Sequence, residues 1–156
     1  MYIAVLAALQ WLHILCGIFW FGSVLTADFI VLPTLRTLSP DVQETFLRAF
    51  VTRAPRVVTV VGGMTILLGV VRGIAGGVLN DLGSAYGLTW MAAFIVGSSL
   101  LFLGARILTP AAHRLISLPQ GPQFEIAMTH VKRLTLTELA GFLVILALMI
   151  AMRFGY

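Results

Sequence analysis

The chain has 156 residues, of which 60% are hydrophobic and 10% are charged, and its formal net charge is +4. A soluble domain carries about 25% charged residues, so this composition excludes an ordinary water-soluble domain. The basic residues lie at the ends of long apolar runs, where membrane topology places them. This position accounts for the positive charge and excludes nucleic acid as a partner.

Four apolar runs are each long enough to cross a bilayer, whose hydrocarbon core needs about 20 helical residues. We expect spans over residues 3–32, 57–79, 86–108 and 134–152. No span has a proline in its interior, so each helix can satisfy its own backbone groups in the bilayer. The sequence therefore predicts an all-α fold, with residues 1–156 forming a single transmembrane domain that is a four-helix bundle.

The basic residues predict the orientation of these spans. Eight of the ten lie in or beside the two longer connections: Arg36, Arg48, Arg53, Arg56, Arg106, Arg114, Lys132 and Arg133. Lys and Arg concentrate on the cytoplasmic side of membrane proteins. We therefore expect a multi-pass protein of the inner (cytoplasmic) membrane, embedded in the lipid bilayer with both termini outside.

The first of these connections has a helical pattern of its own. Ser39 precedes Pro40, which is the typical order of a capping residue and a first helical residue. Val42 and Phe46 then begin an apolar stripe at helical spacing. The pattern predicts an amphipathic helix over residues 40–53 that lies on the inner membrane surface. It would serve as a topological anchor or bind a partner.

His13 is the candidate for cofactor chemistry, because it falls well inside the first span and a neutral imidazole can bind a metal ion or a haem iron. Gly17 and Trp20 follow on the same helical face. The glycine would leave room for a flat macrocycle, and the tryptophan would lie along its edge. The alternative is a core histidine hydrogen-bonded to a neighbouring helix.

Arg72 lies in the outer half of the second span, which runs opposite to the first, so it falls at a depth similar to that of His13. An arginine there needs an anionic partner or a route to the membrane surface. A haem propionate is a suitable bidentate partner, and a lipid phosphate is the alternative. The residues therefore predict haem b, with His13 as the metal ligand and Arg72 as the propionate partner.

Four other ionisable residues receive simpler interpretations. Asp28 and Glu138 lie within one or two turns of the cytoplasmic ends of their spans, and we expect them to be interfacial or hydrogen-bonded. His113 and His130 flank the helix-breaking segment 118–122, and we expect both to be solvated at the membrane surface.

Three short motifs resemble a group of small bacterial membrane proteins: Leu12-His13-Ile14, Phe19-Trp20-Phe21-Gly22 and Leu68-Gly69-Val70. The group includes the copper-resistance D domain, related four-helix proteins and the haem-containing membrane protoporphyrinogen oxidase family. The resemblance covers mainly residues 9–73 and the terminal Met152-Arg153. In the oxidase family the first-helix histidine is associated with haem, a role that the resemblance assigns to His13. The oxidase family relies on an intramembrane lysine, whereas the second to fourth spans of this chain contain none, because Lys132 lies outside them at the interface.

Together these features predict a membrane-embedded b-type haem-binding protein with a role in electron transfer, and an oxidoreductase if it is an enzyme. The second axial ligand stays open, because a five-coordinate iron and a ligand from a second copy are both compatible with the sequence. The expected partner is a homo-oligomer or a redox protein. The alternatives are a copper- or metal-handling membrane protein and a non-catalytic membrane subunit.

Overall fold

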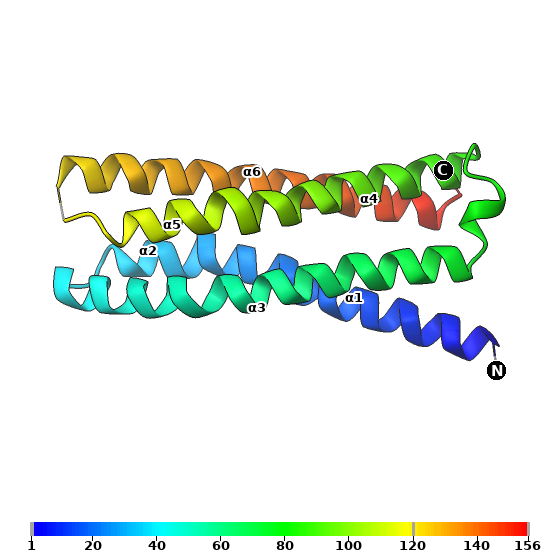
Figure 1. The fold of residues 1–156 in the computed structure, drawn as a ribbon, viewed down its shortest axis with the longest axis horizontal. Helices are drawn as coiled ribbons and strands as arrows, with labels where there is room; N and C mark the ends of the chain where they lie inside the picture. Colours follow the sequence, from blue (N-terminus) through cyan, green and yellow to red (C-terminus); the bar gives the residue numbers. More distant parts are fainter. Residues whose placement is uncertain (1, 120, 156) are drawn as a thin grey trace.

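The computed structural model describes residues 2–119 and 121–155, and the part described is almost entirely helical. The helices form four long rods. In Figure 1 the rods lie side by side and run alternately in opposite directions. In chain order the elements are α1 (Tyr2–Thr26), η1 (Ala27–Val31), α2 (Leu32–Leu35), α3 (Pro40–Ala75), η2 (Val78–Asn80), α4 (Ala85–Leu103), η3 (Gly104–Leu108), α5 (Thr109–Leu115) and α6 (Pro122–Arg153).

Each rod is long and apolar enough to cross a membrane. The rods comprise Tyr2–Leu35, Pro40–Ala75, Ala85–Leu115 and Pro122–Arg153. At about 1.5 Å per residue, even the 31 residues of Ala85–Leu115 exceed the bilayer core of about 30 Å. Large apolar side chains are exposed along all four rods, among them Ile3, Leu67, Ile95 and Leu143. The prediction of a multi-pass four-helix membrane bundle is confirmed.

The buried residues form two clusters along the bundle axis. The middle cluster joins Trp20 and Val24 to Leu100 and Phe142, and the rings of Trp20 and Phe142 meet edge to face at 4.9 Å. The second cluster lies at one end of the bundle and contains Leu35, Leu47, Leu115, Phe124, Met128 and Val131. The six buried residues of this second cluster come from α2, α3, α5 and α6.

Residues 40–53 are helical, as the sequence predicts, but they do not form a separate helix on the membrane surface. They are the first part of α3, which continues through Pro55 to Ala75. Proline removes one backbone hydrogen bond and is normally avoided inside a helix. Leu47 and Val51 are buried within the bundle, and this burial favours continuing the helix over bending it onto the membrane.

The rods also differ in length from the expected spans. The fourth begins at Pro122 rather than near residue 134, and the third continues to Leu115. The second ends earlier than expected, at Ala75, because Gly76 and Gly77 follow it and Gly77 adopts a left-handed conformation with φ of 87°. Apolar composition predicts the part of a helix that lies in the lipid. It does not predict where the helix ends, because a helix can continue beyond the lipid.

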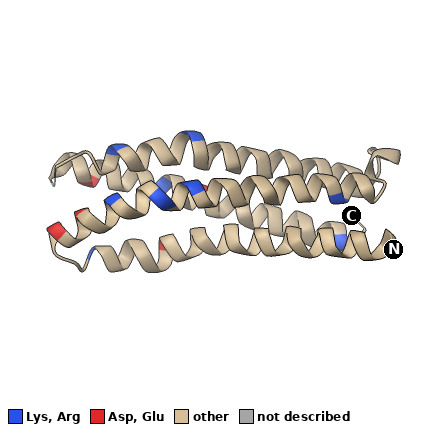
Figure 2. Cartoon of the chain, turned by 60° about the horizontal axis from the view of Figure 1, so that its bottom comes forward, with Lys and Arg blue, Asp and Glu red and all other residues tan. Residues whose placement is uncertain are grey.

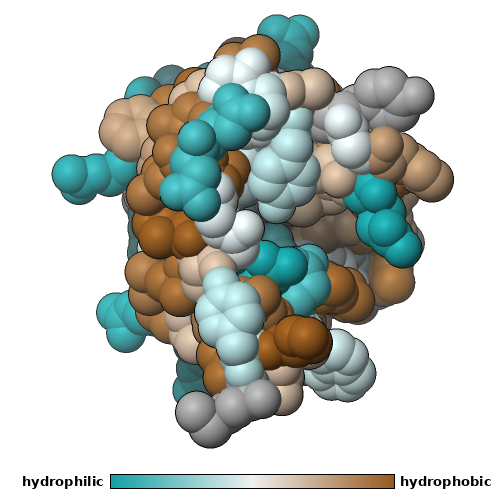
Figure 3. All heavy atoms as spheres, turned by 90° about the vertical axis from the view of Figure 1, so that its right-hand side faces the viewer, coloured by the Kyte–Doolittle hydropathy of each residue, from teal (hydrophilic) through white to brown (hydrophobic). Residues whose placement is uncertain are grey.

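Charge divides the two ends of the bundle. We call the end formed by segments 36–39 and 116–119 the basic end, and the end that contains both termini and segment 76–84 the terminal end. In Figure 2 most Lys and Arg residues lie in the half toward the basic end, and few lie near the termini. Figure 3 views the terminal end, where hydrophilic side chains stand among apolar ones.

Two helices contain a wider π-helical turn immediately before a proline. Pro33 follows η1 by two residues, and Pro110 follows η3 by two residues. A proline ring clashes with the carbonyl four residues earlier and cannot donate to it, so a wider turn relieves the conflict. The Thr109 hydroxyl also donates to the Gly104 carbonyl at 2.8 Å. Residues of both turns line a cavity of about 880 Å³.

Candidate functional site

His13 contacts α3 through one nitrogen of its ring. Its Nδ1 lies 2.8 Å from the carbonyl oxygen of Thr65. A carbonyl can only accept a hydrogen bond, so Nδ1 bears the proton and Nε2 of the neutral ring keeps its lone pair. The hydrogen bond to a neighbouring helix, which the sequence left as an alternative, is thus present. It is also the kind of bond that orients a metal-binding imidazole.

Gly69 makes room for this imidazole. A Cβ atom built on Gly69 would lie 2.8 Å from Cε1 of His13 and 3.1 Å from Nδ1, closer than real side chains approach. A larger residue at this position would therefore push the ring away from Thr65. The sequence indicates Gly69 only as part of the Leu68-Gly69-Val70 motif. It could not show the contact with His13, because the two residues are far apart along the chain.

Gly17 and Trp20 have packing contacts in the structure. A Cβ at Gly17 would lie 3.7 Å from the Thr65 methyl group, so this glycine faces α3. Trp20 is 3% exposed and packs on Gly62 and Phe142. Both residues contribute to the close approach of α1 and α3, and their role beside a macrocycle stays a prediction.

Arg72 lies one helical turn beyond Gly69, about 4.5 Å nearer the terminal end at 1.5 Å per residue. Its guanidinium lies against Gly76 at the end of α3. Its Nε atom is buried and has no hydrogen-bond partner within the described part of the chain. An unsatisfied buried donor is costly, so this atom fits the prediction of an anionic ligand near the terminal end.

A metal ion held by protein ligands alone needs several donor side chains in one place. The described residues contain no group of three or more His, Cys, Asp or Glu side chains able to hold a metal ion. Haem needs only an axial ligand, because the porphyrin supplies the other four nitrogens. His13 offers that ligand, and the unpaired Nε of Arg72 suits an anionic substituent.

His113 and His130 are both exposed near the basic end, as expected of solvated interfacial residues. His113 lies on α5 and His130 on α6, whereas the contact of His13 with Thr65 and Gly69 lies between α1 and α3. Neither has a hydrogen bond or ion pair with another described residue. The structure does not bring them to His13.

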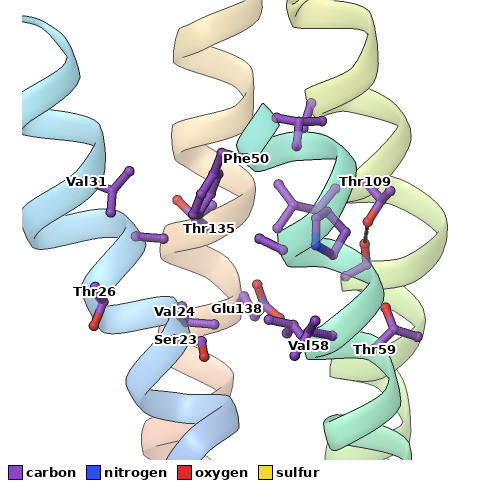
Figure 4. Close-up of a pocket in the computed structure, with 18 of the residues that line it drawn as sticks. Ser23, Val24, Thr26, Val31, Phe50, Val58, Thr59, Thr109, Thr135 and Glu138 are labelled. Atoms are coloured by element: carbon purple, nitrogen blue, oxygen red, sulfur yellow. Dashed lines mark hydrogen bonds between the residues drawn. The ribbon is translucent and has the colours of Figure 1, made fainter. Parts of the chain in front are cut away.

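A second candidate site is a cavity of about 880 Å³ in the half of the bundle toward the basic end. Residues of α1, η1 and α2 form one wall, α3 forms the opposite wall, and η3, α5 and α6 complete it. Asp28 lines it from η1, and Glu138 lines it from α6. Figure 4 shows Glu138 pointing into the space bounded by α1, α3 and α4.

The sequence predicted that Asp28 and Glu138 are interfacial or hydrogen-bonded, and the structure places both inside the bundle, where they line one cavity. Glu138 is 3% exposed, and both carboxylate oxygens of Asp28 are buried. A Cβ at Gly104 would lie 3.3 Å from Oε1 of Glu138, so this glycine gives the carboxylate its space. The available signal was that both acids fall within apolar runs, where ionisable residues mark functional sites by default.

The fold and these sites define a class: a multi-pass, four-helix membrane protein with an imidazole at one level of the bundle and a carboxylate-lined cavity at another. Comparison with protein-family models, with curated proteins and with solved structures finds no match to this chain.

Proposed function

We propose that the chain is an inner-membrane b-type haem protein with a role in electron transfer, oriented with both termini outside. The observation that supports it best is the hydrogen bond from His13 Nδ1 to the Thr65 carbonyl. It leaves Nε2 available as an axial ligand, and Nδ1–H bonds of this kind fix the orientation of metal-binding histidines. The concentration of basic residues near one end supports the orientation.

Each residue has a defined part in this proposal. His13 donates the axial bond from Nε2, the Thr65 carbonyl holds the ring, and Gly69 admits it between the helices. The unpaired Nε of Arg72 binds a propionate. Because this atom is buried, a charge-assisted hydrogen bond to it is strong. Bound haem supplies one-electron redox chemistry, with a potential set by the axial ligand and its surroundings.

The visible absorption spectrum of the purified protein tests the proposal. Protein from haem-replete cells is expected to show a Soret band, and His13→Ala is expected to abolish or strongly shift it. His113→Ala and His130→Ala are the controls, because both side chains are exposed near the other end of the bundle. A colourless wild-type protein contradicts the haem proposal, and metal analysis then decides between a metal-handling protein and a non-catalytic subunit.

A further inference from the structure

The cavity near the basic end has the size and the composition of a ligand site. Its volume of about 880 Å³ falls within the range of about 300–1,000 Å³ that is usual for ligand pockets. Its lining is largely apolar, and its charged residues are Asp28, Glu138 and Arg53. Arg53 is exposed, so the charged groups that the cavity buries are the two carboxylates.

Neither carboxylate has an ion-pair partner within residues 2–119 and 121–155. The Thr135 hydroxyl lies beside Asp28, and the charge of Lys132 is nearby. The hydroxyls of Thr135 and Ser23 are nearby, but they donate to carbonyls of their own helices at 3.0 Å and 2.7 Å. A buried carboxylate without a partner is costly. A proton or a bound cation therefore has to compensate each of them.

The walls favour an organic cation over a metal ion. Calcium and magnesium take six or more oxygen ligands, whereas this lining is mostly apolar. Trp20 and Phe50 line the cavity, and Phe46 and Phe50 stack with ring centroids 5.8 Å apart. Aromatic faces attract cations, and they are a common element of sites for quaternary ammonium groups.

We propose that this cavity binds a lipophilic organic cation, an amine or quaternary ammonium compound with an apolar body, whose charge pairs with Asp28 and Glu138. The apolar body contacts the walls formed by α1 and α3, and the charged group lies beside the carboxylate that Glu138 directs into the cavity (Figure 4). The nearby basic side chains of Arg53 and Lys132 are exposed. Water and salt screen them, whereas buried charges are screened much less.

This site is separate from the proposed haem site. Trp20 is at the boundary, because it lines the cavity while His13 does not. His13 lies two helical turns from Trp20 toward the terminal end and faces Thr65 and Gly69. The cation proposal therefore does not depend on haem binding, and His13→Ala is expected to leave cation binding unchanged.

Two ions of the same shape and opposite charge provide the test. Binding of tetraphenylphosphonium and tetraphenylborate is measured by equilibrium dialysis on the full chain in lipid nanodiscs, with empty nanodiscs as the blank. We expect saturable binding of the phosphonium and none of the borate above the blank. Equal binding of both ions, or binding of neither, would overturn the proposal, because the cavity would then recognise apolar shape alone or hold protonated carboxyls.

Substitutions of the two carboxylates test whether the phosphonium binds in the cavity. Glu138→Gln and Asp28→Asn are each expected to weaken phosphonium binding by at least about tenfold, as removal of one member of a buried charge pair does. Glu125→Gln is the matched control, because Glu125 is an exposed carboxylate on the same helix, and it is expected to bind like the wild type. Unchanged binding in both cavity variants would refute the assignment. The comparison of the two ions on the wild type needs no variant and stands if a variant misfolds.

Discussion

Residues of α3 determine the position of the His13 side chain. Thr65 accepts the hydrogen bond from its ring, and Gly69 leaves the space that the ring fills. Gly17, which shares its helical face, instead approaches the Thr65 methyl group. At the scale of single residues, the small side chains of α1 and α3 therefore decide where the imidazole lies.

Gly69→Ala tests this arrangement. The added methyl group would overlap Cε1 of His13 at 2.8 Å, so the ring has to move away from Thr65. We expect a loss of stability of about 1–3 kcal/mol, the usual cost of overpacking, and lower haem retention, measured by thermal unfolding and by the Soret band. Gly63→Ala is the control, because a Cβ there meets nothing within 4 Å. Equal behaviour of the two variants would contradict the role given to Gly69.

Arg72 provides a second residue-scale prediction. Arg72→Ala is expected to lower haem retention through purification while membrane insertion stays intact. The substitution removes the unpaired Nε that would bind the anion. Arg72→Lys is expected to recover only part of the haem retention, since an ammonium lacks the planar fork of a guanidinium. Arg153→Ala, at an exposed arginine near the same end, is the control. Full haem occupancy in both Arg72 variants would show that this side chain binds lipid phosphate instead.

At the scale of elements, glycine contacts and proline-linked π turns set how the helices begin and bend. The start of α4 is an example, because Ser84 caps it by accepting a hydrogen bond from the Gly87 amide at 3.1 Å. The preceding chain folds back so closely that a Cβ at Gly87 would lie 2.6 Å from the Asp81 carbonyl oxygen and 2.7 Å from Leu82 Cα. These are backbone atoms, which cannot move aside as a flexible side chain can.

Gly87→Ala is therefore expected to destabilise the protein by at least about 1–3 kcal/mol, seen as a lower midpoint of thermal unfolding in detergent. Gly83→Ala is the matched control in the same connection, because its Cβ would find its nearest neighbour at 3.8 Å. If Gly87→Ala unfolds at the wild-type temperature, the tight connection between η2 and α4 does not contribute to stability.

At the scale of the whole molecule, the uneven distribution of charge predicts orientation. In a Cys16→Ala background, Gly83→Cys at the terminal end is expected to react with a membrane-impermeant maleimide in intact cells. Ser117→Cys at the basic end is expected to react only after permeabilisation, because eight of the ten basic residues lie in or beside the connections at that end. Both residues are exposed. The reverse labelling pattern would invert the orientation and leave the four spans intact.

The whole bundle also shows why two sites at different depths are compatible with one fold. The middle cluster around Trp20 separates the level of His13 from the cavity near the basic end. A bundle of long helices can thus hold an imidazole near one level and carboxylates near another without either group contacting the other. The spectrum and the cation-binding assay test the two sites independently.

The sequence by itself determined the number of spans and the segregation of basic residues, because hydrophobicity and charge can be read along the chain. It also identified His13 and Arg72 as ionisable residues inside apolar spans. It did not determine that Pro55 stays within one continuous helix, nor that Pro33 and Pro110 follow π turns, because burial and packing decide how each proline is accommodated.

Only the tertiary structure decided which residues meet: His13 with Thr65 and Gly69, and Asp28 with Glu138 around one cavity. The physical reason lies in the membrane environment. A soluble helix marks its buried face by an apolar stripe, whereas these helices are apolar toward lipid as well as toward each other. The rotation of each helix about its axis is therefore set by the fit of glycines and side chains between helices.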